Sequence, residues 1–312
     1  MTNKIIIITG QTATGKTKFA LEYAKKFKGE LINCDSRQIY KYLDIITGKD
    51  KQLVAKVKVW LYDVVKPDEY FSSFDFVKLA VPIIKKILDE GKTPIIVGGT
   101  YFYLYHLLYK VETENIPPNW RLRKELENKS VKELQDILAK HSFQLIKQLN
   151  QGELNNPHRL IRKIEIVMFY NRHPELVSGS DLSFLRKQES RFRNKFGMTF
   201  YLDRELGFDN LKIEFIGLKY KDKASLKKAI EKRVGERLKL GAIDEVKKLL
   251  KMGYTKANPG LKTIGYQQLL LHLKGVLDID TAIQQWITKE VQYAKRQNTF
   301  MKKDKNIKWI DV

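Results

Sequence analysis

One short segment near the start of the chain, Gly10–Thr17, constrains the fold more than any other feature. Its sequence, GQTATGKT, matches the phosphate-binding loop G-x-x-x-x-G-K-[ST] at every specified position. The β-branched run Ile5–Ile8 before it predicts a buried strand, and apolar residues between Phe19 and Phe27 recur at helical spacing. Strand, loop and helix therefore follow in the order that this loop requires, which predicts a P-loop domain.

The residue types of this loop suit the binding of phosphate. Gly10 and Gly15 allow the backbone to curl so that its N–H groups point inward, and Lys16 adds a positive charge for the phosphate oxygens. The helix that follows presents its N-terminus, where an anion is stabilised. Thr17 can offer its hydroxyl to Mg²⁺ and is the predicted metal ligand. The predicted phosphate-binding residues are Gly10, Gln11, Thr12, Ala13, Thr14, Gly15, Lys16 and Thr17.

The charge of the chain points to a polyanionic partner. The 312 residues carry a formal net charge of +22, from 58 Lys and Arg against 36 Asp and Glu. The single cysteine, Cys34, excludes an internal disulfide framework, and the five histidines show no metal-ligand spacing. No run approaches the ~20 apolar residues of a membrane span. We therefore expect a cytoplasmic protein that does not bind a membrane.

Strand and helix patterns alternate after the loop. The predicted strands are Glu30–Cys34, Trp60–Val65 and Thr93–Val97. A capping signal at Ser72 opens a helix that ends near Leu88. This alternation predicts an α/β, P-loop NTPase-like fold with a doubly wound parallel sheet.

Two polar residues, Asp35 and Thr100, lie just beyond predicted strands. Ligands of open α/β sheets bind beyond the carboxyl ends of the strands, so we expect Asp35 to face the same crevice as the phosphate loop. Gly98 and Gly99 let a ligand approach the backbone closely, and Thr100 adds a hydroxyl at the same rim.

From about Val111 the pattern changes to helices without strands, with capping signals at Ser130 and Asn156. Several cations share one face of this region, a pattern that fits RNA contact and a solvated surface equally well. The segment 173–200 is polar and basic without a period, which predicts a loop, and we assign it no chemistry. The predicted domains are a catalytic core at 1–110 and 205–312, a helical insertion at 111–172 and an atypical loop at 173–200.

Eight sequence blocks, in this order and spacing, resemble those of the tRNA dimethylallyltransferases: GQTATGKT, DSRQIYK, FSSFDF, VGGTYFY, NNPHRLIRKIE, IEKR, LKTIGYQQL and AKRQNTF. The resemblance spans the chain apart from the segment near 173–200. It implies transfer of a dimethylallyl group from dimethylallyl diphosphate to N6 of the adenine immediately 3′ of the anticodon, with Mg²⁺ as cofactor. The implied partner is the anticodon stem-loop of a tRNA, bound by a monomer.

This resemblance gives roles to individual residues. Asp35 is the predicted base that takes the proton of the adenine amine, and Thr100 positions the adenine or that base. Arg233, with Lys16, neutralises the departing diphosphate. The adenine must leave its stack to reach the allyl group. The residues predicted to bind tRNA are Asp35, Ser36, Arg37, Gln38, Thr100, Arg121, His158, Arg159, Leu160, Ile161, Arg162, Lys262, Lys295, Arg296 and Gln297.

Two other functions share some of these features. A P-loop small-molecule kinase would use the same fold, Lys16, Thr17 and Mg²⁺, but it explains neither the basic insertion nor DSRQIY as a unit. A non-enzymatic RNA-binding NTPase switch would need a Walker B carboxylate, for which Asp63 is the one candidate. The identity of the bound phosphate compound, a nucleoside triphosphate or an allylic diphosphate, separates these readings.

Overall fold

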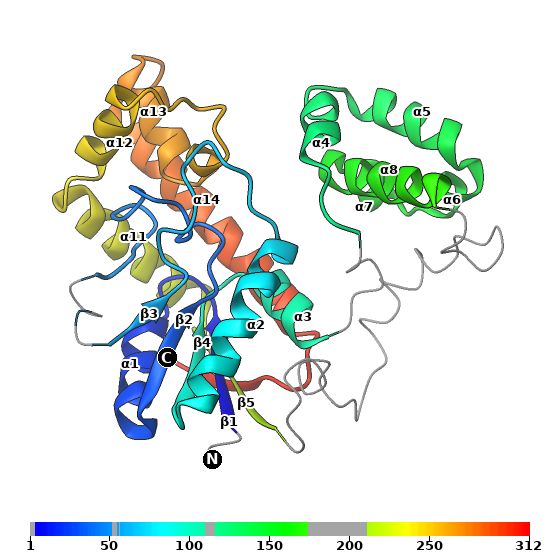
Figure 1. Ribbon diagram of the computed structural model, residues 1–312. Coiled ribbons are helices and arrows are strands. Elements are labelled where there is room, and N and C mark those ends of the chain that lie inside the picture. Colours follow the sequence, from blue (N-terminus) through cyan, green and yellow to red (C-terminus); the bar gives the residue numbers. More distant parts are fainter. Residues whose placement is uncertain (1–3, 52–54, 56, 110–115, 174–210) are drawn as a thin grey trace. The chain divides into compact units, whose positions relative to one another are not determined.

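The structure, a computed structural model, describes residues 4–51, 55, 57–109, 116–173 and 211–312 (Figure 1). The chain forms two compact units, one made of Met1–Tyr109 with Phe200–Val312 and the other of Lys110–Thr199. The loop predicted at 173–200 lies outside the described residues except for His173. The functions predicted for the individual domains remain predictions.

The first unit is built on a six-stranded, all-parallel sheet in the order β3-β2-β4-β1-β5-β6. Its strands within the described residues are β1 (Lys4–Gly10), β2 (Gly29–Asn33), β3 (Val59–Trp60), β4 (Thr93–Val97), β5 (Lys212–Lys219) and β6 (Lys308–Asp311). The apolar run Ile5–Ile8 places β1 between β4 and β5, and all four side chains are fully buried. Successive side chains point to opposite faces, so both faces of the sheet are covered. The predicted α/β parallel sheet is confirmed.

Helices follow the strands where caps and apolar periodicity predict them. The first unit contains α1 (Lys16–Phe27), α2 (Ser73–Asp89), α3 (Tyr101–Leu108), α11 (Lys223–Lys239), α12 (Ala242–Lys251), the short 3-10 helix η2 (Gly260–Lys262), α13 (Tyr266–Leu273) and α14 (Ile279–Met301). The Ser72 side chain accepts from the Asp75 N–H and the Asp75 carboxylate from the Ser72 N–H, which is the predicted capping box. Helix α1 buries Ala20, Leu21 and Ala24 against one face of the sheet.

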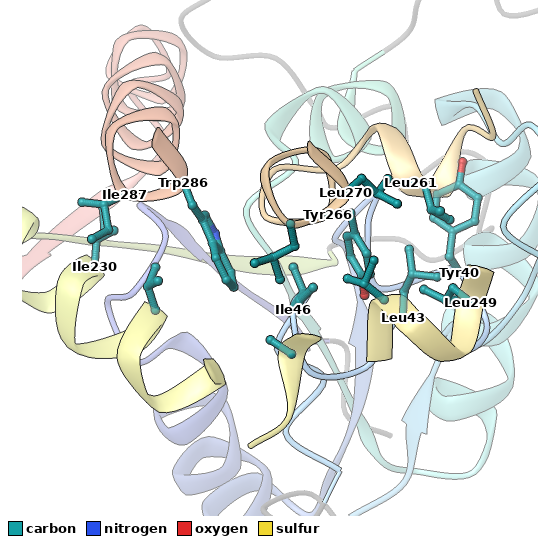
Figure 2. Close-up of a cluster of buried hydrophobic side chains, with 14 of the residues drawn as sticks. Tyr40, Leu43, Ile46, Ile230, Leu249, Leu261, Tyr266, Leu270, Trp286 and Ile287 are labelled. Atoms are coloured by element: carbon teal, nitrogen blue, oxygen red, sulfur yellow. The ribbon is translucent and has the colours of Figure 1, made fainter. Parts of the chain in front are cut away.

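A second core packs α11, α12, α13 and α14 against the segment that follows Asp35. Figure 2 shows Trp286 and Tyr266 within it, and both side chains are fully buried. The Glu245 carboxylate of α12 accepts hydrogen bonds from the backbone N–H groups of Asp44 (2.8 Å) and Ile45 (2.6 Å). The later helices therefore hold the segment that begins at the end of β2.

The regular elements in the described part of the second unit are all helices. Its helices are α4 (Trp120–Leu126), α5 (Val131–His141), α6 (Phe143–Gln148), α7 (Gln151–Leu154) and α8 (Pro157–Arg172). Ser130 forms the predicted capping box with Glu133, and the Asn156 side chain caps α8 at the Arg159 N–H. Leu134, Leu138 and residues of α8 form a hydrophobic core of their own.

The predicted strand Trp60–Val65 is wrong in its length, because β3 ends at Trp60. Leu61 (φ 65°) and Asp63 (φ 57°) adopt left-handed backbone conformations, which an extended strand cannot contain. The Asp63 carboxylate pairs with the buried Lys49 ammonium at 2.6 Å. Its charge is therefore taken up by a structural ion pair, which removes the support for a Walker B role.

None of the helices in the described part of the chain combines the length and the apolar character needed to cross a membrane.

Candidate active site

The phosphate loop connects β1 directly to α1. Gly10 has φ 134°, and a Cβ there would lie 2.1 Å from the Leu218 carbonyl oxygen of β5, so only glycine fits. Gly15 (φ 75°) and Ala13 (φ 65°) also adopt positive φ, which gives the loop its curled path. The sequence pattern thus corresponds to a backbone that can surround an anion.

Lys16 is the cation of this loop. Its Nζ donates hydrogen bonds to the carbonyl oxygens of Gly10 (3.2 Å) and Gln11 (2.6 Å). Burial, together with the nearby Arg233 guanidinium, lowers the pKa of Lys16 to about 8, although the carboxylates of Asp35 and Glu290 oppose the shift. Arg233 of α11 and Gln297 of α14 both contact Thr12, so these two helices and the loop meet at one place.

Arg233 of α11 also contacts the phosphate loop. Its Nη1 donates to the Thr12 hydroxyl at 2.6 Å, and its Nη2 lies 3.6 Å from Glu290. The Nε of Arg233 is buried and has no hydrogen-bond acceptor within the described residues. A buried N–H donor without an acceptor is costly, so this geometry fits an oxygen atom of a bound anion.

Glu290 is itself held firmly. Its Oε1 accepts hydrogen bonds from Arg237 Nη1 (3.0 Å) and from the indole N–H of Trp286 (3.1 Å). Although burial alone would raise it, the pKa of Glu290 is lowered by Arg233 and Arg237. The carboxylate therefore stays charged between two arginines, of which Arg233 faces the loop.

Asp35 and Thr100 lie at the ends of neighbouring strands, β2 and β4. The Thr100 N–H donates to the Cys34 carbonyl at 3.2 Å, and the Thr100 hydroxyl accepts from the Ser36 N–H at 2.9 Å. One carboxylate oxygen of Asp35 accepts from the Arg37 N–H at 2.8 Å. Gly98 permits this approach, because a Cβ there would lie 2.0 Å from the Cys34 carbonyl oxygen.

The sequence does not predict the interactions that Tyr220, Gln297 and Tyr293 make at this edge of the sheet. The Tyr220 hydroxyl donates to the Ala13 carbonyl at 2.6 Å, and the Gln297 amide contacts the loop at Thr12. Burial raises the pKa of Tyr293 to about 12, and Asp35 adds to this shift. Tyr293 and Gln297 lie four residues apart, on one face of a helix, which is the one local signal that could have linked them.

The predicted tRNA-binding residues fall into both units. His158, Lys262, Lys295 and Arg296 are exposed, and the Arg121 side chain is 91% exposed. Arg159 and Arg162 are partly buried. In Arg162, the guanidinium pairs with Glu165 and donates to the Ile116 carbonyl at 2.9 Å. The Arg162 guanidinium therefore has a structural role within the second unit.

Three members of the predicted tRNA-binding set have buried side chains. Leu160 is 0% exposed and Ile161 is 7% exposed, because both belong to the core face of α8. Gln297 is also 7% exposed, and its amide forms hydrogen bonds with Thr12 and Gly99. The part of these three residues in tRNA binding stays a prediction.

The residues near the loop fit Mg²⁺ in one particular way. Among the described residues, no group of three or more His, Cys, Asp or Glu side chains is arranged to hold a metal. Mg²⁺ usually keeps several waters and binds through one or two protein ligands together with substrate phosphates. The half-buried Thr17, at the start of α1, fits such a site as a single hydroxyl ligand.

Comparisons with known proteins agree over nearly the whole chain. The model of the IPP transferase family matches residues 38–304. The tRNA dimethylallyltransferase of Acetivibrio thermocellus is 36% identical over 311 residues, covering 99% of this chain and 92% of the relative. That of Endomicrobium trichonymphae is 33% identical over 317 residues, covering 98% and 94%.

Solved structures give the same result. The tRNA isopentenylpyrophosphate transferase of Staphylococcus epidermidis matches with a TM-score of 0.64 at 32% identity, over 99% of this chain and 93% of the other. A eukaryotic dimethylallyltransferase, described as acting on tRNA, matches with a TM-score of 0.70 at 25% identity, over 99% and 73%.

Proposed function

Because the chain belongs to the family of tRNA dimethylallyltransferases, we propose that it transfers a dimethylallyl group from dimethylallyl diphosphate to N6 of the adenine immediately 3′ of the anticodon. One observation carries the chemistry: the phosphate loop, Asp35 and Thr100 lie at the same edge of one parallel sheet. A diphosphate bound at the loop thus has a carboxylate within electrostatic reach of Lys16.

The donor side neutralises the leaving group. As the bond between the allylic carbon and the diphosphate oxygen breaks, negative charge develops on the diphosphate. The loop N–H groups, Lys16 and Arg233 stabilise this charge, with the unpartnered Nε of Arg233 as one donor. Mg²⁺, held at Thr17, would supply further charge neutralisation when bound.

The acceptor side removes a proton. The adenine amine is a poor nucleophile, and it attacks the allylic carbon while its proton passes to the Asp35 carboxylate. The new N–C bond forms as the C–O bond to the diphosphate breaks, and the diphosphate leaves with the electron pair. Thr100, whose hydroxyl is tied to the Ser36 N–H, orients the amine or Asp35.

Binding of the anticodon stem-loop relies on cations outside the reacting centre. The adenine must be extruded from its stack to enter the crevice, as in other enzymes that modify bases. Exposed cations such as Arg121, Lys262 and Lys295 suit contacts with phosphates, which position the RNA without reading its sequence. We place the reaction in the cytoplasm and assign it to a monomer.

The function is tested by incubating the protein with tRNA, dimethylallyl diphosphate and Mg²⁺ and measuring the tRNA nucleosides by mass spectrometry. The expected product is N6-dimethylallyladenosine, at one position 3′ of the anticodon. Omission of the diphosphate is the control. Turnover of ATP with a small-molecule acceptor, and no modified adenosine, would instead support the kinase reading.

A further inference from the structure

One side chain joins the two halves of the proposed site. Gln297 of α14 is buried, and its Oε1 accepts a hydrogen bond from the Thr12 N–H of the phosphate loop at 3.0 Å. Its Nε2 donates to the Gly99 carbonyl oxygen at 2.9 Å. A single carboxamide thus bridges two loops that are far apart in the sequence.

Each of these loops carries a group of the proposed reaction. The Thr12 hydroxyl accepts from Arg233 Nη1 at 2.6 Å, so Thr12 belongs to the diphosphate side. Gly99 precedes Thr100, whose hydroxyl accepts from the Ser36 N–H next to Asp35, so Gly99 belongs to the adenine side. The relative position of the two sides decides the distance between the allylic carbon and the attacking amine.

We propose that Gln297 is a positioning residue of the transfer reaction, which fixes the phosphate loop at a set distance from the Gly99–Thr100 turn. This inference rests on the proposed function, because the two sides are defined by it. It differs from the role that the sequence predicts for Gln297, which is contact with tRNA.

The chemistry of the side chain supports a role that needs an amide. The bridge requires one acceptor and one donor on the same planar group, which glutamine supplies and a carboxylate does not. Asparagine is shorter by one methylene, so its amide would not reach the same two contacts. Gly99 adds to the constraint, since a Cβ there would lie 2.4 Å from Gln297 Nε2. The close distance between Gly99 and the Gln297 amide therefore depends on both residues.

The expected effect of breaking the bridge is on the chemical step. Each side keeps its own substrate contacts, so binding of dimethylallyl diphosphate and of tRNA should each change by less than about threefold. Misplacement of reacting groups by about 1 Å costs roughly 100-fold in rate, so the single-turnover rate should fall by roughly 10- to 100-fold.

The experiment compares Gln297→Met with Gln292→Met. Both glutamines lie on α14, but Gln292 is exposed, and it has no assigned role in the site. We expect Gln292→Met to behave like the parent, and Gln297→Met to lose rate with both dissociation constants retained. Loss of tRNA affinity as the main effect of Gln297→Met would overturn the proposal in favour of RNA contact.

Two further variants cover a failure of Gln297→Met to fold. Gln297→Glu keeps an acceptor for the Thr12 N–H and loses the donor to Gly99, and Gly99→Ala displaces the amide from the other side. Both should lower the single-turnover rate with little change in the two binding constants. Normal rates in all folded variants would overturn the bridge but not the proposed function. A parent protein that transfers no dimethylallyl group would overturn both.

Discussion

The carboxylate of Asp35 can be tested without disturbing its surroundings. Asp35→Asn keeps an oxygen that accepts from the Arg37 N–H, the contact that the Asp35 side chain makes at 2.8 Å. It removes the proton acceptor, so turnover should fall by roughly 100-fold or more, the usual size of a general base contribution. Affinity for tRNA should stay within a few-fold. The measurement is a single-turnover assay with a parallel binding titration, and near-normal turnover would exclude Asp35 as the base.

The charge of Lys16 predicts a pH dependence. Burial, with the help of Arg233, lowers the pKa of this ammonium to about 8. Below that pH the group is a cation that attracts the diphosphate, and above it the charge is lost. For dimethylallyl diphosphate, kcat/KM should therefore decline as the pH rises through about 8, since this parameter reports the free enzyme. In Lys16→Ala the decline should be absent and the value low throughout. A decline of kcat/KM near pH 8 that persists in Lys16→Ala would belong to another titrating group.

At the scale of single residues, the sequence predicts which residue types gather but not how they are joined. Gly10, Lys16 and Asp35 follow from a local pattern together with the rule for parallel strands. The bridge from Gln297 to Thr12 spans most of the chain, and no local pattern encodes such a contact. Glu290 is a similar case, because its partners Arg233 and Arg237 lie on another helix.

Among the elements, α8 depends on one buried carboxylate. Glu165 is 3% exposed and accepts from Arg123 Nε (3.0 Å) and Nη2 (2.7 Å), and it also pairs with Arg162. Burial alone would raise the pKa of Glu165, but these hydrogen bonds hold it below the ordinary 4.5. The carboxylate thus stabilises the second unit above about pH 4.5, and this contribution is lost as the pH falls through the lower, folded-state pKa.

We therefore expect Glu165→Ala to destabilise the second unit by about 1.5–3 kcal/mol at neutral pH, the range for hydrogen bonds to charged groups. Hydrogen exchange of the amides in α5 and α8 measures this locally. Glu125→Ala is the control, because its partner Arg121 is exposed and such surface pairs contribute about 0–1 kcal/mol. The difference between parent and Glu165→Ala should shrink in acid, and a difference that is constant with pH would contradict the role of the charge.

Caps and apolar periods predict the helices well, since both signals are local. Ser72, Ser130 and Asn156 each begin a helix as the sequence indicates. The third strand shows the limit of this approach: its apolar and aromatic residues favour extension, yet Leu61 and Asp63 take positive φ. Neither residue is glycine, so the turn is not predicted by the usual glycine signal.

For the whole molecule, the net charge of +22 predicts a strong salt dependence of RNA binding. Each phosphate contact releases a counterion, so the logarithm of the affinity should fall linearly with the logarithm of the salt concentration. Arg121→Ala should reduce this slope by about one unit or less and weaken all substrate tRNAs alike, without slowing the chemical step.

The matched control is Lys132→Ala, which removes another exposed cation of the second unit, one with no assigned RNA contact. Both variants lose an exposed cation that has an acidic partner four residues away, so the two substitutions differ chiefly in their position on the second unit. The measurement is a salt titration of binding to an isolated anticodon stem-loop. A salt response that is flat in the parent, or equal losses in both variants, would mean that Arg121 is not an RNA contact.

The order of the strands also has a consequence for protein synthesis. Strand β1 pairs with β4 on one side, within the first hundred or so residues, but its other partner, β5, begins about 200 residues after β1. At about 5–20 residues per second, the ribosome needs roughly 10–40 s to produce that partner. During this interval β1, with its four consecutive isoleucines, has one edge that no native strand can yet cover, and an unpaired apolar edge is a site of aggregation. The synthesis of the whole helical unit, Lys110–Thr199, falls within this interval.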